Sequence, residues 1–276
     1  MERDAIINIK PLGSMWPVIN PFLFFAHHLD YYPAGNEKME PDASLKGRNI
    51  GNDFTPKDGW RMYHGNKVPG FPVHPHRGFE TVTLVMTGFV DHSDSHGQAG
   101  RYSKGDVQWM TAGAGLQHSE MFPLLNIEDE NPLELFQIWL NLPKSKKFAE
   151  PHFKMLWSED IPIYRTTDDQ GKSTEVNVIA GSIANVTALP SAPDSWAANP
   201  ENEVAIWTIR MDKGAKWKIP PASNAVNRML YFYKGVSLTV NGIEVNSNQA
   251  IELMANEEVT IANGDSVSNR NLFICH

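Results

Sequence analysis

The sequence predicts an all-β protein, and three of its features lead to this fold class. Apolar and polar residues alternate with a period of two through several short segments, as they do in strands that bury one face. These segments are rich in Val, Thr, Ile, Trp and Tyr, and they end in Gly or Asn. Helical periodicity is scarce, so the strands are expected to form a sandwich or small barrels rather than a parallel sheet with crossover helices.

The expected elements follow one another along the chain as short strands separated by turns. The apolar segment 15–26 is interrupted by two prolines and is expected to be buried strand and turn. Asn241-Gly242 separates two strand-like runs, so residues 234–245 are expected to form a hairpin with a type I′ turn. The predicted strands cover residues 79–88, 105–113, 133–142, 176–181, 204–211, 228–235 and 236–242.

The length of the chain favours two domains. Its 276 residues, 41% of them hydrophobic, can bury more than one core. Pro143 stops a predicted strand, and a Lys-rich connector follows it. We therefore expect one domain at residues 1–146 and another at residues 147–276, each about the size of one β-barrel. The Pro-rich segment 189–202 is expected to be a surface loop of the second domain.

Charge and cysteine content limit the classes of function. The formal net charge is -8, which argues against a nucleic-acid surface, because such a surface needs clustered Lys and Arg. The one cysteine, Cys275, cannot form an internal disulfide, and it has no basic or histidine neighbour apart from His276, so that a nucleophilic role is not expected. Neither a signal peptide nor an apolar run of about 18 residues is evident. The expectation is a cytoplasmic protein without a membrane span.

The histidines point to a metal site in the first domain. Eight of the ten precede residue 120, and His74 and His76 are two residues apart. Side chains at i and i+2 of a strand share a face, so these two imidazoles can bind one ion. Pro75 between them favours extended geometry at residue 74. Glu80 has the same parity as His76.

A second pair lies about forty residues further on. His118 and Glu120 are again at i and i+2, and a neighbouring strand would bring them to the first pair. Three imidazoles and a carboxylate would leave an octahedral ion two open positions for water, a bidentate substrate or dioxygen. Glu80 is a competing carboxylate for the same ion.

The remaining histidines are expected away from this site. His27 and His28 are expected in a loop or lid, and His64 near the mouth of a pocket. His92 and His96 are expected at a solvated hairpin tip. Four other large side chains are expected in the hydrophobic core: Trp109, Met110, Met121 and Trp139.

Two stretches of the first domain carry a family resemblance. The sequence HPHRGFETVT, followed by GDVQWMTAGAGLQHSEM, resembles the pirin family of the cupin superfamily. The segments INPFLFFAHH and LFQIWLNLP are similar to the flanks of the family's motifs, so that the resemblance covers most of residues 15–157. It implies a bicupin of two stacked jelly-roll β-barrels with one mononuclear metal, usually iron, in the N-terminal barrel and none in the second.

Carried onto matching positions, the resemblance implies the ligands His74, His76, His118 and Glu120. The general cupin pattern instead uses the glutamate that follows the HxH pair, which is Glu80 here. The ligand set also accepts Ni, Mn, Co, Cu or Zn, and iron is chosen by resemblance alone.

The resemblance implies two alternative functions. One is a dioxygenase of the quercetin 2,3-dioxygenase type, which opens a flavonol-like aromatic substrate with O2 while Glu120 or Glu80 accepts a proton. The other is a non-enzymatic, iron-binding regulator that acts on a protein partner and does not contact nucleic acid directly. A monomer is the family expectation.

Overall fold

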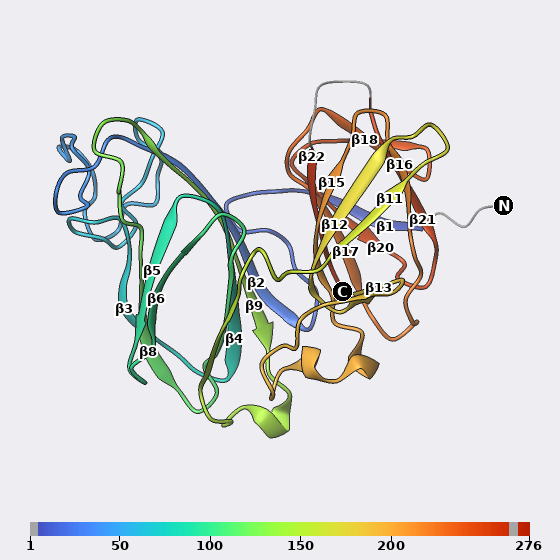
Figure 1. The fold of residues 1–276 in the computed structure, drawn as a ribbon, viewed down its shortest axis with the longest axis horizontal. Helices are drawn as coiled ribbons and strands as arrows, with labels where there is room; N and C mark the ends of the chain where they lie inside the picture. The colour runs from blue at the N-terminus through green and yellow to red at the C-terminus, as the bar shows by residue number, and fades with distance from the viewer. Residues whose placement is uncertain (1–4, 265–269) are drawn as a thin grey trace. The chain divides into compact units, whose positions relative to one another are not determined.

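The computed structural model describes residues 5–264 and 270–276, and they form an almost entirely β structure (Figure 1). Each of the seven predicted strands is present. Within the described residues, no helix is long and apolar enough to cross a membrane.

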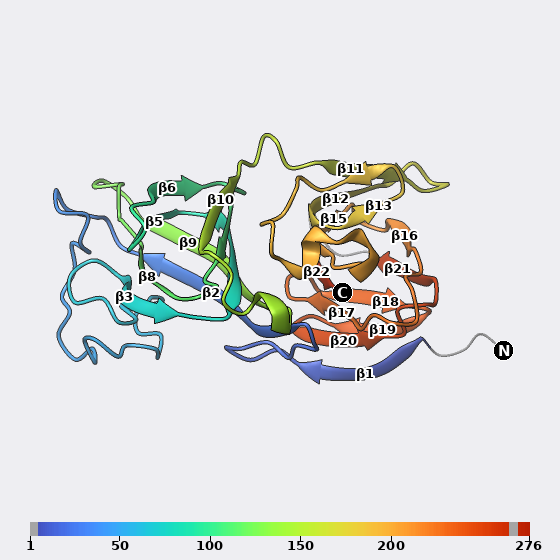
Figure 2. The same ribbon diagram turned by 90° about the horizontal axis from the view of Figure 1, so that it is seen from below.

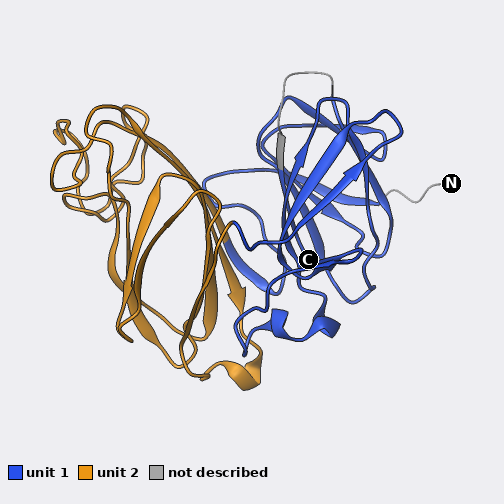
Figure 3. Ribbon diagram, viewed as in Figure 1, with its two compact units in different colours: residues 1–24, 159–276 blue, residues 25–158 orange. Residues whose placement is uncertain are grey.

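The chain divides into two compact units (Figure 3). Unit 2 is the continuous segment 25–158, whereas unit 1 combines residues 1–24 with residues 159–276. The predicted boundary at residue 146 therefore falls inside unit 2, because a strand after it returns to the sheet of this unit. The first residues of the chain belong to unit 1 because their strand pairs with one near residue 250.

Unit 2 is built from two antiparallel sheets (Figure 1). One has the strand order β10-β7-β4-β9-β2 and the other β3-β8-β5-β6. A hydrogen bond from Thr83 of β4 to Glu120 of β8 joins their inner faces. The elements are β2 (Phe22–Tyr32), β3 (Gly70–His76), β4 (Phe79–Thr87), β5 (Phe89–Asp94), β6 (Ala99–Ser103), β7 (Val107–Thr111), β8 (Leu116–Met121), β9 (Asn131–Asn141), the 3-10 turn η1 (Lys144–Lys146) and β10 (His152–Leu156).

Unit 1 contains a seven-stranded sheet in the order β1-β20-β17-β22-β15-β12-β11, a four-stranded sheet in the order β16-β21-β18-β19, and a short pair, β13-β14 (Figure 2). Apolar side chains such as Trp207, Leu230 and Ile251 form its core. The elements are β1 (Ile6–Pro11), β11 (Ile163–Thr167), β12 (Ser173–Ala180), β13 (Ser182–Ile183), β14 (Val186–Thr187), η2 (Trp196–Ala198), η3 (Pro200–Asn202), β15 (Ile206–Met211), β16 (Lys216–Ile219), β17 (Arg228–Phe232), β18 (Ser237–Val240), β19 (Ile243–Asn246), β20 (Gln249–Leu253), β21 (Val259–Asn263) and β22 (Arg270–Cys275).

Two local predictions in unit 1 are confirmed. Val240 pairs with Ile243 across a two-residue loop, in which Asn241 and Gly242 have φ values of 48° and 80°. Both central residues have positive φ, as a type I′ turn requires. The Pro-rich segment 189–202 contains no strand and only the two single-turn 3-10 elements, η2 and η3.

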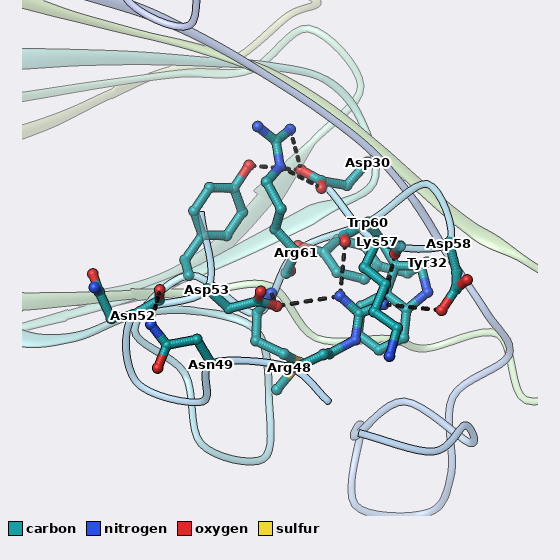
Figure 4. A network of polar contacts seen from close by, with 12 residues as sticks. Asp30, Tyr32, Arg48, Asn49, Asn52, Asp53, Lys57, Asp58, Trp60 and Arg61 are labelled. Carbon is teal, nitrogen blue, oxygen red and sulfur yellow. Dashed lines mark hydrogen bonds and ion pairs between the residues drawn. The ribbon is translucent and has the colours of Figure 1, made fainter. Parts of the chain in front are cut away.

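A buried polar network holds the long connection between β2 and β3 in unit 2 (Figure 4). Arg61 donates to both carboxylate oxygens of Asp30, over 2.9 and 3.0 Å, and Tyr63 Oη donates to the same carboxylate over 2.6 Å. Burial raises the pKa of Asp30, although its bonds with Arg61 oppose that shift. Arg48 lies over the ring of Trp60, with Cζ 3.3 Å from the ring centroid. These contacts stabilise the connection between β2 and β3, which contains no strand.

Candidate metal centre

The pairing of three strands in unit 2 gathers the predicted site residues. Strand β8 lies between β3 and β5, and His118 is opposite His74 on one side and Asp94 on the other. Glu120 is opposite His92. Because alternate residues of a strand share a face, one face of this sheet carries His118, Glu120 and the side chains aligned with them.

Three imidazoles converge on that face. Ligand atoms of His74, His76 and His118 all lie within 4.8 Å of one another. His74 Nε2 is 3.1 Å from His76 Nε2. Two nitrogens that each lie about 2.1 Å from one ion are about 3.0 Å apart at a right angle and about 3.4 Å apart at the tetrahedral angle. The observed separation lies between these two values, so the two nitrogens are close enough to bind a single ion.

Hydrogen bonding at His74 orients its ligand nitrogen. Its Nδ1 lies 2.8 Å from the carbonyl oxygen of Pro72. A carbonyl oxygen can only accept, so Nδ1 carries the hydrogen and Nε2 keeps its lone pair. This is the tautomer that binds a metal through Nε2.

A chain of two residues orients His118 in the same way. His92 Nε2 lies 3.2 Å from Asp94 Oδ2, and His92 Nδ1 lies 3.3 Å from His118 Nδ1. The carboxylate accepts from Nε2–H of His92, whose Nδ1 lone pair then accepts from Nδ1–H of His118. His118 Nε2 is left with its lone pair. It is buried, and no residue in the described ranges 5–264 and 270–276 hydrogen-bonds to it.

The electrostatics keep the imidazoles of His76 and His118 neutral. Burial, together with His118 and His74, lowers the pKa of His76 to about 4. Burial and the neighbouring His74 and His92 lower the pKa of His118 to about 3. Burial would raise the pKa of Asp94, but hydrogen bonds from the Gln98 backbone and from His92 outweigh it and lower the value. At neutral pH the site therefore presents imidazole lone pairs beside an ionised Asp94.

The two predicted carboxylates lie on different strands and have different hydrogen-bond partners. Glu120 Oε2 is 3.8 Å from His118 Nε2, next to the three-histidine cluster. Thr83 Oγ1 donates to Glu120 Oε1 over 3.2 Å, and Gln137 Nε2 donates to Glu120 Oε2 over 2.8 Å. Glu80 is fully buried on β4, where it accepts a hydrogen bond of 2.7 Å from Thr111. The cluster of converging ligand atoms includes neither carboxylate.

Aromatic rings border the imidazoles. The ring of His76 lies 5.0 Å from that of Phe79 and 5.4 Å from that of Trp139, measured between centroids. Trp139, expected in the core, is only partly buried and lies beside the candidate site, whereas Trp109 and Met110 are fully buried as predicted. An open surface hollow of about 640 Å³ includes His76 and is lined further by Pro75, Arg77, Ser95, Gly115, Leu116 and Gln117.

Three expectations for the other histidines need correction. His27 and His28 lie within strand β2 rather than in a loop or lid, and His28 Nδ1 lies 2.8 Å from Tyr63 Oη. His92 is 3% exposed and lies in β5, so it is not solvated. His96 is exposed as expected. The spacing of His92 and Asp94 at i and i+2, the same as in the two ligand pairs, is the signal in the sequence that could have identified them.

The residues present fit a mononuclear transition metal. Three imidazoles converge, hydrogen bonds orient two of them, and the carboxylate of Glu120 lies at the edge of the cluster. A buried nitrogen that lacks a hydrogen-bond partner, as His118 Nε2 does, is unfavourable unless an ion or water meets it. The donor set suits Fe, Ni, Mn, Co, Cu or Zn.

Comparison with known proteins finds relatives of this chain. The sequence model of the family described as Pirin matches residues 18–140. A Pseudomonas aeruginosa protein named "Putative quercetin 2,3-dioxygenase PA3240" is 34% identical over 197 residues, which are 70% of this chain and 65% of that protein. The aligned segments of three curated relatives span 35%, 47% and 65% of their own lengths.

Solved structures share the fold along nearly the whole chain. The crystal structure of quercetin 2,3-dioxygenase from Acinetobacter baumannii has a TM-score of 0.70 at 23% identity, covering 98% of this chain and 85% of that one. The bacterial pirin YhhW from Escherichia coli, in complex with nickel(II), has a TM-score of 0.56 at 16% identity, covering 97% of this chain and 98% of that one. The family model over residues 18–140, which contain the strand pairs that carry HxH and HxE, shows that this part of the chain is a Pirin domain, and the solved structures show that the chain has their fold.

Proposed function

We propose that this protein is a metal-dependent dioxygenase of the pirin type, which opens a flavonol-like aromatic substrate with O2. The observation that carries the proposal is the convergence of His74, His76 and His118, with the tautomers of two of them fixed by hydrogen bonds. Relatives named for quercetin 2,3-dioxygenase support this class of reaction. The nickel(II) complex of YhhW supports a metal in this fold.

His74, His76 and His118 would hold the metal, and Glu120 would complete the set. When bound, the metal supplies Lewis acidity, which lowers the pKa of a coordinated hydroxyl group. We take iron as the metal of the proposal, with nickel, manganese, cobalt, copper and zinc to be compared with it.

The carboxylates would move the substrate's proton. Glu120 is held by Thr83 and Gln137, so its position is defined before a substrate arrives. Its Oε2, close to the imidazoles, is the proposed acceptor of the hydroxyl proton. Glu80, which is buried on β4 and accepts a hydrogen bond from Thr111, is the second candidate acceptor.

The aromatic rings beside His76 would orient a flat substrate. Phe79 and Trp139 lie 4.6 Å apart between ring centroids and form one wall next to the imidazole. Offset stacking on such a wall favours an aromatic ring system and excludes water from one side of the reacting group. A flavonol has the shape that this wall accepts.

The test combines metal analysis with turnover. Protein purified without added metal is analysed for its elements and is then loaded with Fe²⁺ or Ni²⁺ and incubated aerobically with quercetin. Loss of the flavonol absorption with release of carbon monoxide is expected, and His76→Ala should abolish both metal binding and turnover. His96→Ala, a change to an exposed histidine, is the matched control.

The outcomes separate the alternatives. Unchanged turnover in His76→Ala would place the reaction elsewhere. Stoichiometric metal binding at these histidines without turnover for any of the metals would leave the iron-binding regulator as the function. Failure to bind any transition metal would exclude both. Glu120→Gln and Glu80→Gln, compared in the same assay, show which carboxylate takes the proton.

A further inference from the structure

Unit 1 contains a cavity with the dimensions of a small-molecule site. Its volume is about 560 Å³, and strands β12, β15 and β17 contribute to its walls together with the Pro-rich segment 189–202. Small-molecule sites commonly have volumes of roughly 300–1,000 Å³. Most of the lining is apolar and includes Ala180, Ala188, Leu189, Pro190, Pro220 and Pro221.

The cavity wall contains a buried arginine that lacks a counter-ion. Arg228, the first residue of β17, is 1% exposed, and its Nε and Nη1 atoms are buried without a hydrogen-bond partner. Among residues 5–264 and 270–276, no carboxylate lies within ion-pair distance of its guanidinium group. Burial lowers the pKa of Arg228 to about 10, so the group stays charged at neutral pH.

Glu203, whose charge acts on Arg228, is already hydrogen-bonded elsewhere. Glu203 also lines the cavity, but its two carboxylate oxygens accept hydrogen bonds of 3.2 and 3.1 Å from the backbone N–H of Ser223. Its charge opposes the fall in the pKa of Arg228 without forming an ion pair with it. The compensation of the buried charge is therefore incomplete.

Other polar groups in the wall are also without partners. Trp207, which is 1% exposed, lines the cavity, and its indole Nε1 is buried without a hydrogen-bond acceptor in the described part of the chain. The same holds for His276 Nδ1. The guanidinium and indole groups can only donate, so a ligand that satisfies them must accept.

These features define the chemistry of a ligand that would fit the cavity. A buried charge without a partner is strongly unfavourable, which an anion in the cavity would relieve. The planar fork of a guanidinium matches a carboxylate with two parallel hydrogen bonds. The apolar remainder of the wall suits a hydrocarbon body rather than a small inorganic ion.

We propose that this cavity is a second ligand site, which binds a small organic carboxylate through Arg228 and packs its apolar body against Leu189 and Pro220. The site lies in unit 1 and does not involve the histidines of unit 2. The proposal for this site therefore does not depend on the proposed dioxygenase activity.

Calorimetric titration of the full chain tests the proposal, with acetate, benzoate and octanoate as probes. Saturable binding is expected for benzoate or octanoate, and at least tenfold weaker binding for acetate, for neutral benzyl alcohol and for inorganic phosphate. Arg228→Met should abolish carboxylate binding. Arg228→Lys, which keeps the charge but loses the fork, should weaken it at least tenfold.

Matched measurements keep the test decisive. Arg165→Met removes an exposed arginine and should leave binding unchanged. Without ligand, Arg228→Met should unfold at the same temperature as the wild type or higher, because it removes an uncompensated charge. If Arg228→Met does not fold, the carboxylate affinity of Arg228→Lys is the deciding measurement. Absence of saturable binding for all three carboxylates, equal affinity of the wild type and the Arg228 variant, or equally tight binding of phosphate would each overturn the proposal.

Discussion

The chain from Asp94 through His92 to His118 should determine how tightly the candidate centre binds a metal. In His92→Phe, the buried Nδ1–H of His118 loses its acceptor, which lies 3.3 Å away in the wild type. An unsatisfied buried donor costs about 1–3 kcal/mol. The alternative tautomer avoids this cost but places the hydrogen on Nε2, where the metal would bind. In the variant the metal-free protein is expected to adopt this alternative tautomer. Metal binding must then restore the Nδ1–H tautomer with its unsatisfied donor, so the penalty falls on metal binding.

The size of the effect follows from this penalty. Loss of a group that orients a metal-binding histidine typically weakens affinity about 10- to 100-fold, which corresponds to about 1.4–2.7 kcal/mol. The phenyl ring should keep the stacking on Phe153, whose centroid lies 5.0 Å from that of the His92 ring, so the fold should be retained. Asp94→Asn keeps an acceptor oxygen but removes the charge, so it should lose less metal affinity than His92→Phe.

The assay is a titration with Ni²⁺ against a competing chelator, with thermal unfolding of the metal-free protein as a check on the fold. His96→Phe is the control, since it makes the same substitution at an exposed position of the same hairpin. An affinity of His92→Phe equal to that of the control would refute the reasoning. It would mean that the tautomer of His118 does not depend on His92.

Three further predictions concern stability and reactivity. Arg61→Met leaves the buried carboxylate of its partner uncompensated, so the free energy of unfolding at pH 7 should fall by about 3–5 kcal/mol. Burial already raises the pKa of the Asp30 carboxyl group, so protonation at pH 5 should make the variant's loss of unfolding free energy smaller than at pH 7. Denaturant titrations at the two pH values measure this loss, and a larger loss at pH 5 would contradict the prediction. Gly242→Ala should lower the free energy of unfolding by only about 1 kcal/mol, because a Cβ at this position meets no other atom. Gly113→Ala should lower it several times more, because its Cβ would overlap the Ala149 carbonyl oxygen. Equal melting temperatures of the two variants would count against this steric argument. Burial raises the pKa of the Cys275 thiol, so a disulfide reagent should label it only on unfolding, and rapid labelling of the native protein would show that the thiol is accessible.

The fold class and the ligand pairs could be predicted because they depend on local periodicity. Strands with period two place His74 with His76, and His118 with Glu120, on common faces whatever the tertiary structure. The Asn241-Gly242 turn is likewise fixed by the backbone preferences of two adjacent residues. Such features need no knowledge of distant segments.

The features that the sequence did not predict depend on pairing between distant segments. His92 lies in a segment rich in Asp, Ser and Gly, which suggested solvent exposure. In the structure this segment pairs with β8, and its polar residues face the candidate ligands. The alternation of side chains along a strand also allowed either Glu80 or Glu120 to be the carboxylate ligand. Only the placement of β4 and β8 in different sheets distinguishes the two. The boundary at residue 146 differs from the observed units because β10 returns to β7 after the connector.

The pairing of β1 with β20 affects the order in which the chain can fold during synthesis. Ile6 is opposite Leu253, so the first strand leaves the ribosome long before its partner exists. The continuous segment 25–158 has all of its own strand partners by the time residue 158 is made, and domains generally fold as their sequence emerges. Unit 2 can therefore mature on the ribosome, while β1 waits for almost the whole chain to be translated before its edge is covered.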